Sequence, residues 1–211
     1  MNQDQYTLIE FENVSKSYNR RLIFDSVSFK INNSNIFAIK GDNGKGKSTI
    51  LKLILGIESY QKGNIKYFDI FTNKSIKSEE FNNRISFVSP YLQLYNDLTL
   101  LEIVNFYLKL RGSVFNKDNF EYYASMFEIY KFKNEYLKNY SSGMYQRVRI
   151  LLSLLIDTNV YIYDEPTSNL DKKGIDCFYK IVDDFKKNNK TLIIASNEER
   201  EIELCDSYFS L

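Results

Sequence analysis

The stretch GDNGKGKST, residues 41–49, limits what this chain can fold into more than any other feature. It fits the pattern G-x-x-x-x-G-K-[ST], with Gly41, Gly46, Lys47 and Ser48 at the specified positions. Glycines at this spacing let the backbone bend so that successive N–H groups point inward at phosphate oxygens. Lys47 is then placed to reach the outer phosphates of a nucleotide, and the Ser48 hydroxyl to ligate Mg²⁺.

The flanking sequence favours a phosphate-binding loop over the alternative, a flexible basic turn that matches by chance. The wholly apolar run Ile36–Ile39 precedes the loop and is typical of a strand covered on both faces. Residues Ser48–Leu55 follow with helical spacing and are closed by Gly56. The predicted nucleotide contacts come from the whole loop, namely Gly41, Asp42, Asn43, Gly44, Lys45, Gly46, Lys47, Ser48 and Thr49.

A second apolar strand, Val160–Tyr163, ends in two acidic residues, Asp164 and Glu165. We predict that Asp164 holds Mg²⁺, directly or through water, because a carboxylate at a strand end is the usual partner of a phosphate loop. Glu165 is the predicted general base, which polarises the attacking water. The alternative is an acidic strand end that only caps the following turn.

The sequence contains fewer signals for the identity of the nucleobase than for the phosphates. A guanine-reading Asn-Lys-x-Asp element is missing, since the stretch Asn73–Ile76 reads Asn-Lys-Ser-Ile. Tyr18 lies in an expected early loop and is placed to stack on adenine. An aromatic ring makes the same contact with any flat base, so Tyr18 alone does not identify adenine.

The pattern along the chain predicts an α/β fold of the P-loop NTPase type. Apolar strands alternate with helices, which favours a mainly parallel sheet flanked by helices, and an antiparallel β portion is expected near the N-terminus. We expect one domain over residues 1–211, with a RecA-like core at about 1–89 and 141–211 and an inserted helical subdomain at about 90–140. The expected strands besides those already named are Tyr6–Val14, Ser26–Ile31, Ile65–Phe68, Arg84–Val88, Thr191–Ala195 and Ser207–Leu211, and the expected helices are Ser142–Ile156, Lys172–Lys187 and several between Leu100 and Leu137.

Composition excludes several other classes of protein and site. Lys plus Arg number 28 against 27 Asp plus Glu, which argues against a protein that binds nucleic acid through its phosphate backbone. The absence of histidine removes the commonest general base and a common metal ligand. The two cysteines, Cys177 and Cys205, are expected to be buried thiols rather than a disulfide.

The expected location is the cytosol. The longest apolar stretches, such as Ile150–Ile156, are too short to cross a bilayer. The N-terminal residues MNQDQYTLIEFE contain Asp4 and Glu10 and lack the apolar core of a secretory leader.

Between the two motifs lies the segment Tyr140–Arg147, which reads YSSGMYQR. Together with GDNGKGKST and YDEPTSNLD, in this order and at this approximate spacing, it makes the chain resemble the ATP-binding-cassette (ABC) ATPases over nearly its whole length. The resemblance implies hydrolysis of ATP with Mg²⁺ as cofactor. It also implies a second ABC ATPase subunit, identical or different, because the signature segment of one subunit covers the ATP that is bound to the other.

Particular residues acquire roles from this resemblance. Ser141, Ser142 and Gly143 correspond to the signature that faces the γ-phosphate across the interface. Ser141 is a good N-cap, so the following helix aims its N–H groups at that phosphate. Tyr18 resembles the adenine-stacking aromatic, and Asp171 resembles the residue that links the two sites.

The chain departs from the family pattern at two positions. The usual metal-contacting glutamine has Pro90 in its place, and Gln93, three residues later, is the remaining candidate ligand. The usual switch histidine is replaced by Asn197, whose amide donates a hydrogen bond but cannot take up a proton and become positively charged. We therefore expect slow but real hydrolysis, with Glu165, Lys47 and Asn197 as the catalytic residues.

The leading hypothesis for the biological role is the energising subunit of an ABC transporter on the cytoplasmic face of a membrane. The transmembrane permease subunits are then separate proteins, docked near Pro90–Leu101, although the aromatic residues there are as well explained by packing within the subdomain. The alternative is a soluble ABC ATPase with cytosolic partners, similar to the one that serves iron–sulphur-cluster assembly. DNA-repair and translation ATPases of the family are disfavoured, because neither a long coiled coil nor a second cassette is present.

Overall fold

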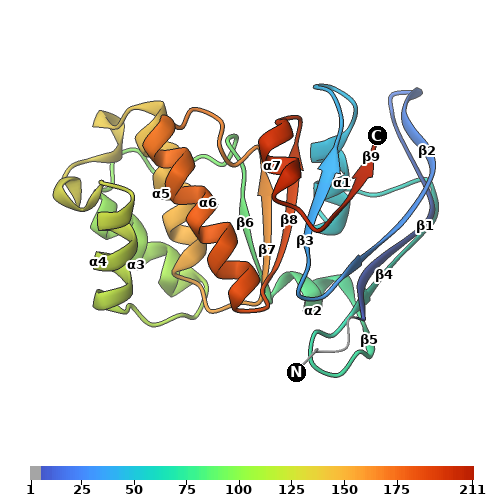
Figure 1. Ribbon diagram of the computed structural model, residues 1–211, viewed down its shortest axis with the longest axis horizontal. Helices are drawn as coiled ribbons and strands as arrows, with labels where there is room; N and C mark the ends of the chain where they lie inside the picture. Colours follow the sequence, from blue (N-terminus) through green and yellow to red (C-terminus); the bar gives the residue numbers. More distant parts are fainter. Residues whose placement is uncertain (1–5) are drawn as a thin grey trace. The chain divides into compact units, whose positions relative to one another are not determined.

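The computed structural model describes residues 6–211, so the first five residues of the predicted non-secretory N-terminus lie outside the described part. The described chain forms two compact units (Figure 1). The first comprises residues up to Ile85 together with Asn159–Asp164 and Asp184–Leu211. The second comprises Ser86–Thr158 and Glu165–Asp183, and therefore contains all of residues 90–140.

A parallel sheet is the core of the first unit, as predicted. Its strands lie side by side in the order β7-β8-β3-β9, and each neighbouring pair is parallel. Strands β7 and β8 are buried along their whole length, and only the last residue of β3 is not, because apolar runs are covered on both faces. The strand bounds are β3 (Ile36–Lys40), β7 (Val160–Asp164), β8 (Thr191–Ser196) and β9 (Ser207–Ser210).

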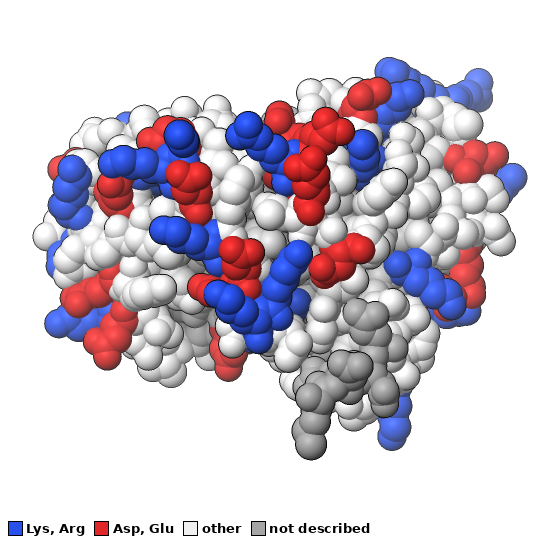
Figure 2. Space-filling model, in the orientation of Figure 1, with Lys and Arg blue, Asp and Glu red and all other residues white. Residues whose placement is uncertain are grey.

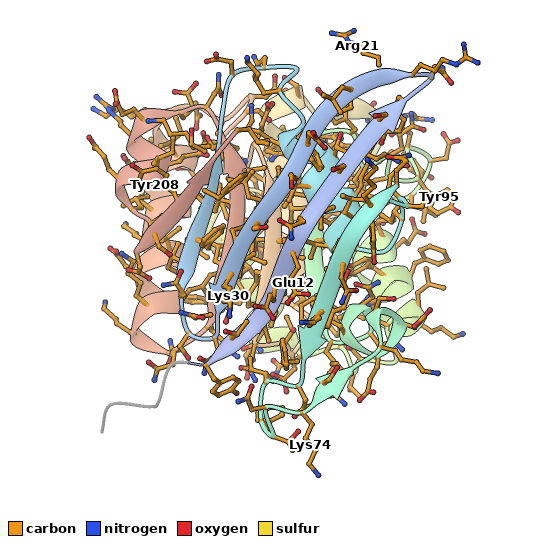
Figure 3. All side chains as sticks on the ribbon, turned by 90° about the vertical axis from the view of Figure 1, so that its right-hand side faces the viewer. Glu12, Arg21, Lys30, Lys74, Tyr95 and Tyr208 are labelled. Carbon is orange, nitrogen blue, oxygen red and sulfur yellow. The ribbon has the colours of Figure 1, made fainter. Side chains whose placement is uncertain are left out.

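An antiparallel sheet of order β2-β1-β4-β5 completes the strands of the first unit, and its outer face is shown in Figure 3. Strands β1 (Thr7–Tyr18) and β2 (Arg21–Asn32) are longer than the predicted segments. The register shifts between Phe11 and Val14, where Asn13 has φ 48°. Such a bulge inserts an extra residue and interrupts the alternation of apolar and polar residues. This explains why the predicted strand ended at Val14, whereas β1 continues to Tyr18.

The other elements of the first unit are short. Helix α1 follows β3 as predicted, whereas β5, α2 and α7 were not predicted, since two to five residues carry too little periodicity to be recognised. Their bounds are α1 (Lys47–Ile54), β4 (Lys62–Phe68), β5 (Ser75–Ile76), α2 (Ser78–Asn82) and α7 (Glu199–Glu203), and β6 (Ile85–Val88) begins at the last residue of the first unit's N-terminal segment.

The second unit is mainly helical. Helix α3 begins with a capping box, in which the Thr99 hydroxyl accepts from the Glu102 N–H and the Glu102 carboxylate accepts from the Thr99 N–H. Fully buried apolar side chains, among them Phe120 and Phe127, hold its helices together. The helices are α3 (Leu100–Leu110), α4 (Lys117–Met126), α5 (Ser142–Leu154) and α6 (Lys172–Lys187), with 3₁₀ turns at Tyr130–Phe132 and Leu137–Asn139.

The surface shows mixed charge. On the face drawn in Figure 2, basic and acidic side chains are interspersed, as the balance of 28 basic and 27 acidic residues leads one to expect. No helix within residues 6–211 is both long and apolar enough to span a membrane. Cys177 and Cys205 are free thiols and are half-buried rather than fully buried.

Asp69 supplies a first test of the fold of the first unit. Its carboxylate accepts hydrogen bonds from the Phe71 N–H (3.0 Å), the Thr72 N–H (2.7 Å), the Thr72 hydroxyl (2.8 Å) and the Arg84 guanidinium. These donors, the Thr72 hydroxyl foremost, lower the pKa of Asp69 to about 2. Since the pKa in the unfolded chain is about 3.9, the ionised group stabilises the fold above about pH 4, and this stabilisation is lost as the pH falls towards 2.

We expect Asp69→Asn to lower the free energy of unfolding at pH 7 by about 1–3 kcal/mol, because an amide leaves part of this donor set unsatisfied. The difference from the wild type should shrink between about pH 4 and pH 2. Urea unfolding at a series of pH values measures it. The exposed Asp176→Asn is the control, and a pH-independent difference for Asp69→Asn would contradict the role assigned to its ionised form.

Candidate functional site

The predicted phosphate loop joins strand β3 to helix α1 in the first unit (Figure 1). Gly44 and Gly46 have φ angles of 81° and 104°, which L-residues with a side chain rarely adopt. At Gly46, which is the N-cap of α1, an added Cβ would lie 2.6 Å from the Ile23 side chain. The glycines are therefore required by the path of the backbone, which brings the loop to the N-terminal end of α1, where unpaired N–H groups favour an anion.

Lys47 lies inside this loop rather than in solvent. It is 4% exposed, and its ammonium donates to the Gly41 carbonyl (2.8 Å), the Asp42 carbonyl (3.2 Å) and Asn43 Oδ1 (3.4 Å). All three acceptors are formally neutral, so they orient the ammonium without cancelling its charge. The loop thus holds a positive charge in place for an anionic ligand.

Ser48 and Asp164 meet within the first unit, although 116 positions separate them in the sequence. The Ser48 hydroxyl donates to Asp164 Oδ1 at 3.1 Å. Asp164 is the last residue of β7 and is 3% exposed. A hydroxyl and a carboxylate oxygen are the hard ligands that Mg²⁺ prefers, and Mg²⁺ commonly needs only one or two protein ligands besides substrate phosphates. The pair therefore fits the predicted metal.

The first unit also contains Tyr18 and Asn197. Tyr18 ends strand β1 rather than lying in a loop, and 36% of it is exposed. Asn197 follows β8 directly and its side chain is exposed, as a residue that meets a ligand from solvent must be.

The predicted signature segment opens helix α5 in the second unit. Ser141 is the N-cap, and its hydroxyl accepts from the Met144 N–H at 3.3 Å. The backbone at Gly143 passes so close to the Asn169 carbonyl that an added Cβ would lie 2.7 Å from that oxygen. A depression of about 850 Å³ opens here, lined by Ser141, Ser142, Gly143, Met144, Arg147 and Asp171, among others.

Asp171 is held at this depression by Arg147, a residue that the sequence analysis did not single out. The Arg147 guanidinium donates to Asp171 Oδ1 (2.6 Å) and to the Phe127 carbonyl (2.6 Å). The Gly174 N–H also donates to Asp171 and, with Arg147, lowers the pKa of its carboxyl. The sequence did offer one signal for Arg147, because a charged residue among the apolar residues of a predicted helix needs a partner when it is buried.

Glu165 is the first residue of the second segment of the second unit, and its backbone is in the left-handed region with φ 45°. Such a conformation persists only where neighbouring contacts enforce it. The Glu165 carbonyl accepts from the Ser168 N–H (3.1 Å), and the adjacent Pro166 carbonyl accepts from Gln146 Nε2 (2.9 Å). Gln146 is fully buried, so helix α5 fixes the turn that carries Glu165.

Gln93 lies in the second unit with an exposed side chain. Its neighbour Leu92 is tied to helix α5, because Arg149 Nε donates to the Leu92 carbonyl at 2.9 Å. Arg149 also donates to Gln146 at 3.2 Å. The metal contact of Gln93 stays a prediction.

Comparisons of sequence and structure with known proteins all match ATP-binding proteins of ABC transporters. The family model described as ABC transporter matches residues 24–168. The phosphonates import ATP-binding protein of Fusobacterium nucleatum is 31% identical over 205 residues, which cover 89% of this chain and 81% of that protein. The lantibiotic transport ATP-binding protein of Streptococcus pyogenes is 28% identical over 196 residues, with coverage of 93% and 82%. An ATP-binding cassette solved as a dimer in a post-hydrolysis state with ADP and phosphate has the same fold, with a TM-score of 0.82, 22% identity and coverage of 97% and 94%.

Proposed function

The chain belongs to the ABC transporter family, and we propose that it is the ATP-binding and ATP-hydrolysing subunit that powers a transporter through closure and opening of an ATPase dimer. The observation that carries the proposal is the convergence of Lys47, Ser48 and Asp164 in one unit. Relatives whose names assign them to phosphonate import and lantibiotic transport favour this role over that of a soluble ATPase with cytosolic partners.

In the first unit, the loop N–H groups and the Lys47 ammonium bind the phosphates of ATP. Ser48 and Asp164 would hold Mg²⁺, which would supply positive charge to neutralise the phosphate oxygens. Tyr18 stacks on the base, and the Asn197 amide donates to the γ-phosphate. Each of these residues positions or neutralises the triphosphate, and none removes a proton from water.

The remaining roles are assigned to residues that matched the family motifs and belong to the second unit. Glu165 accepts a proton from the attacking water while the water oxygen bonds to the γ-phosphorus. The bond between the γ-phosphorus and the β,γ-bridging oxygen breaks, and ADP and phosphate are released. The N-terminus of α5, with Ser141 and Gly143, faces the ATP of a second ABC ATPase subunit, and Asp171 links the two sites. Gln93 is retained as a candidate metal contact on the segment after β6.

In this proposal the transporter's membrane-spanning subunits are separate proteins and this subunit works at the cytoplasmic face of the membrane, which the names of the relatives, ATP-binding proteins of import and transport systems, support. Within the segment Pro90–Leu101 the side chains of Tyr91 and Tyr95 are 78% and 63% exposed. Tyr95 packs edge-on against Phe106 at 5.3 Å between ring centroids, which holds it in an exposed position. Exposed aromatic side chains on a fixed support suit the docking of a short helix from a membrane subunit.

Two measurements test the proposal. The purified chain should release phosphate from ATP only when Mg²⁺ is present, and loss of turnover on chelation should be reversible. The chain tagged at its natural level should co-purify from detergent-solubilised membranes with a protein that has several membrane spans. Recovery with cytosolic proteins alone would contradict the transporter role while leaving the ATPase assignment intact.

Asn197→His is expected to raise the turnover number several-fold, because an imidazole, unlike an amide, can be protonated near neutral pH and then carries a positive charge. Steady-state phosphate release at saturating ATP measures the change, and the dissociation constant for ATP should stay within about twofold, since the phosphate loop is untouched. Asn188→His, on a solvent-facing turn after α6, is the matched control. An unchanged turnover number for Asn197→His would show that position 197 does not act on the γ-phosphate.

A further inference from the structure

A buried lysine lies against the ring of the proposed base-stacking tyrosine. Lys16 is on strand β1, two residues before Tyr18. Only 3% of Lys16 is exposed, and its Nζ is 4.3 Å from the centroid of the Tyr18 ring. Lysine is almost never this buried unless its charge is paired, so the contacts of this ammonium require an explanation.

The ammonium is held by two oxygen acceptors on the segment after α1. It donates to the Ser59 carbonyl at 2.6 Å and to a Glu58 carboxylate oxygen at 3.1 Å. With the ring of Tyr18 as a third partner, all of its donor directions have a partner. Lys16 is thus a fixed cation, fully engaged by the protein, and is not available to bind a phosphate itself.

The same carboxylate also lies close to the tyrosine. Glu58 and Thr49, the residue after Ser48 in the first turn of α1, are both near enough to the Tyr18 hydroxyl to influence its pKa. Burial, followed by Glu58, raises the pKa of Tyr18, so the ring carries a neutral phenol at physiological pH. Glu58 holds the Lys16 ammonium, and the ammonium in turn covers one face of the Tyr18 ring.

We infer that Lys16 is a positioning residue for nucleobase binding, which acts through Tyr18 and strengthens the binding of a nucleoside triphosphate without contributing to the binding of its phosphates. This inference rests on the proposed function, in which Tyr18 stacks on the base. A cation over one face of an aromatic ring occupies that face and draws electron density from the ring, which leaves the opposite face for a flat, electron-rich partner. A purine offers more stacking area than a pyrimidine, so the larger effect falls on purine nucleotides.

The experiment is a thermodynamic cycle on the full chain, with ATP, CTP and inorganic tripolyphosphate as three Mg²⁺-bound probes in isothermal titration calorimetry. Lys16→Met is expected to weaken ATP binding about three- to thirty-fold, the range that cation–π contacts span from exposed to desolvated sites. It should weaken CTP binding less and leave tripolyphosphate binding unchanged. In a Tyr18→Leu background, Lys16→Met should have no further effect on ATP binding, because its route to the base has been removed. Lys62→Met, an exposed lysine on the neighbouring strand β4, is the control for the change in charge.

The outcomes separate the possible failures. An equal loss of affinity for ATP and tripolyphosphate would show that Lys16 is merely structural, and additive effects of the two variants would show that it does not act through Tyr18; either result overturns the inference. If Lys16→Met does not fold, Glu58→Gln carries the test, because it removes the carboxylate charge that holds the Lys16 ammonium but keeps an amide oxygen that can accept from it. Glu58→Gln should then weaken ATP binding selectively, and unchanged ATP binding would overturn the inference. If the wild type binds ATP no more tightly than tripolyphosphate, the inference is overturned as well. If the wild type binds neither ligand, the proposed function itself is contradicted.

Discussion

Replacing Glu165 with Gln is expected to lower the rate of ATP hydrolysis by about 10²–10⁴-fold while the dissociation constant for ATP changes by less than about threefold. Gln has the same shape but cannot accept the proton of the attacking water. The backbone of Glu165, with φ 45°, is held by the hydrogen bonds of the Glu165 and Pro166 carbonyls, neither of which involves the side chain. The variant should therefore keep the turn and lose the chemistry alone.

Single-turnover phosphate release and equilibrium titration of ATP separate the two quantities. Because hydrolysis opens the dimer in the proposed cycle, the variant with ATP should also accumulate as a dimer in gel filtration. Glu135→Gln, an exposed residue of the second unit, is the control for the change in charge. Turnover by Glu165→Gln within about fivefold of the wild type would mean that another group accepts the proton.

Much of the fold could be predicted because short-range patterns reflect burial. Strand β3, the loop and α1 follow from an apolar run, a glycine motif and helical spacing in immediate succession. Helix α6 was predicted with the bounds that the structure has, Lys172–Lys187, because its apolar residues recur with helical period over sixteen residues. The bulge near Asn13 shows the limit, since one extra residue in a strand reverses the alternation on which the prediction depends.

The candidate site was predictable to the extent that its residues belong to motifs. Lys47, Ser48 and Asp164 were placed together because the spacing of each motif reflects the chemistry that they share. Lys16 belongs to no motif, and Arg147 ends the segment YSSGMYQR without a role that its spacing predicts. Their carboxylate partners lie 42 and 24 positions away in the sequence. Contacts of that range depend on how the elements pack, which no local pattern encodes.

The second large effect is expected at Lys47. Replacing it with Met should raise the dissociation constant for ATP at least about 10- to 100-fold, because each charge-assisted hydrogen bond to a phosphate contributes about 1.5–3 kcal/mol. Met keeps most of the side-chain volume at a position that is 4% exposed, so the fold should tolerate it. Removal of the ammonium also leaves the Gly41 and Asp42 carbonyls without their shared donor, which loosens the loop that the phosphates require.

Lys45→Met provides a matched control, since Lys45 is an exposed lysine in the same loop, two residues earlier. A general electrostatic attraction between the loop and ATP would be weakened alike by either variant, and more so at low salt than at high salt. If Lys47 binds the phosphates specifically, Lys47→Met should weaken ATP binding far more than Lys45→Met does at every salt concentration. Equal losses would mean that the three acceptors around the Lys47 ammonium serve only the structure of the loop, and the loop would then bind phosphate through its backbone N–H groups alone.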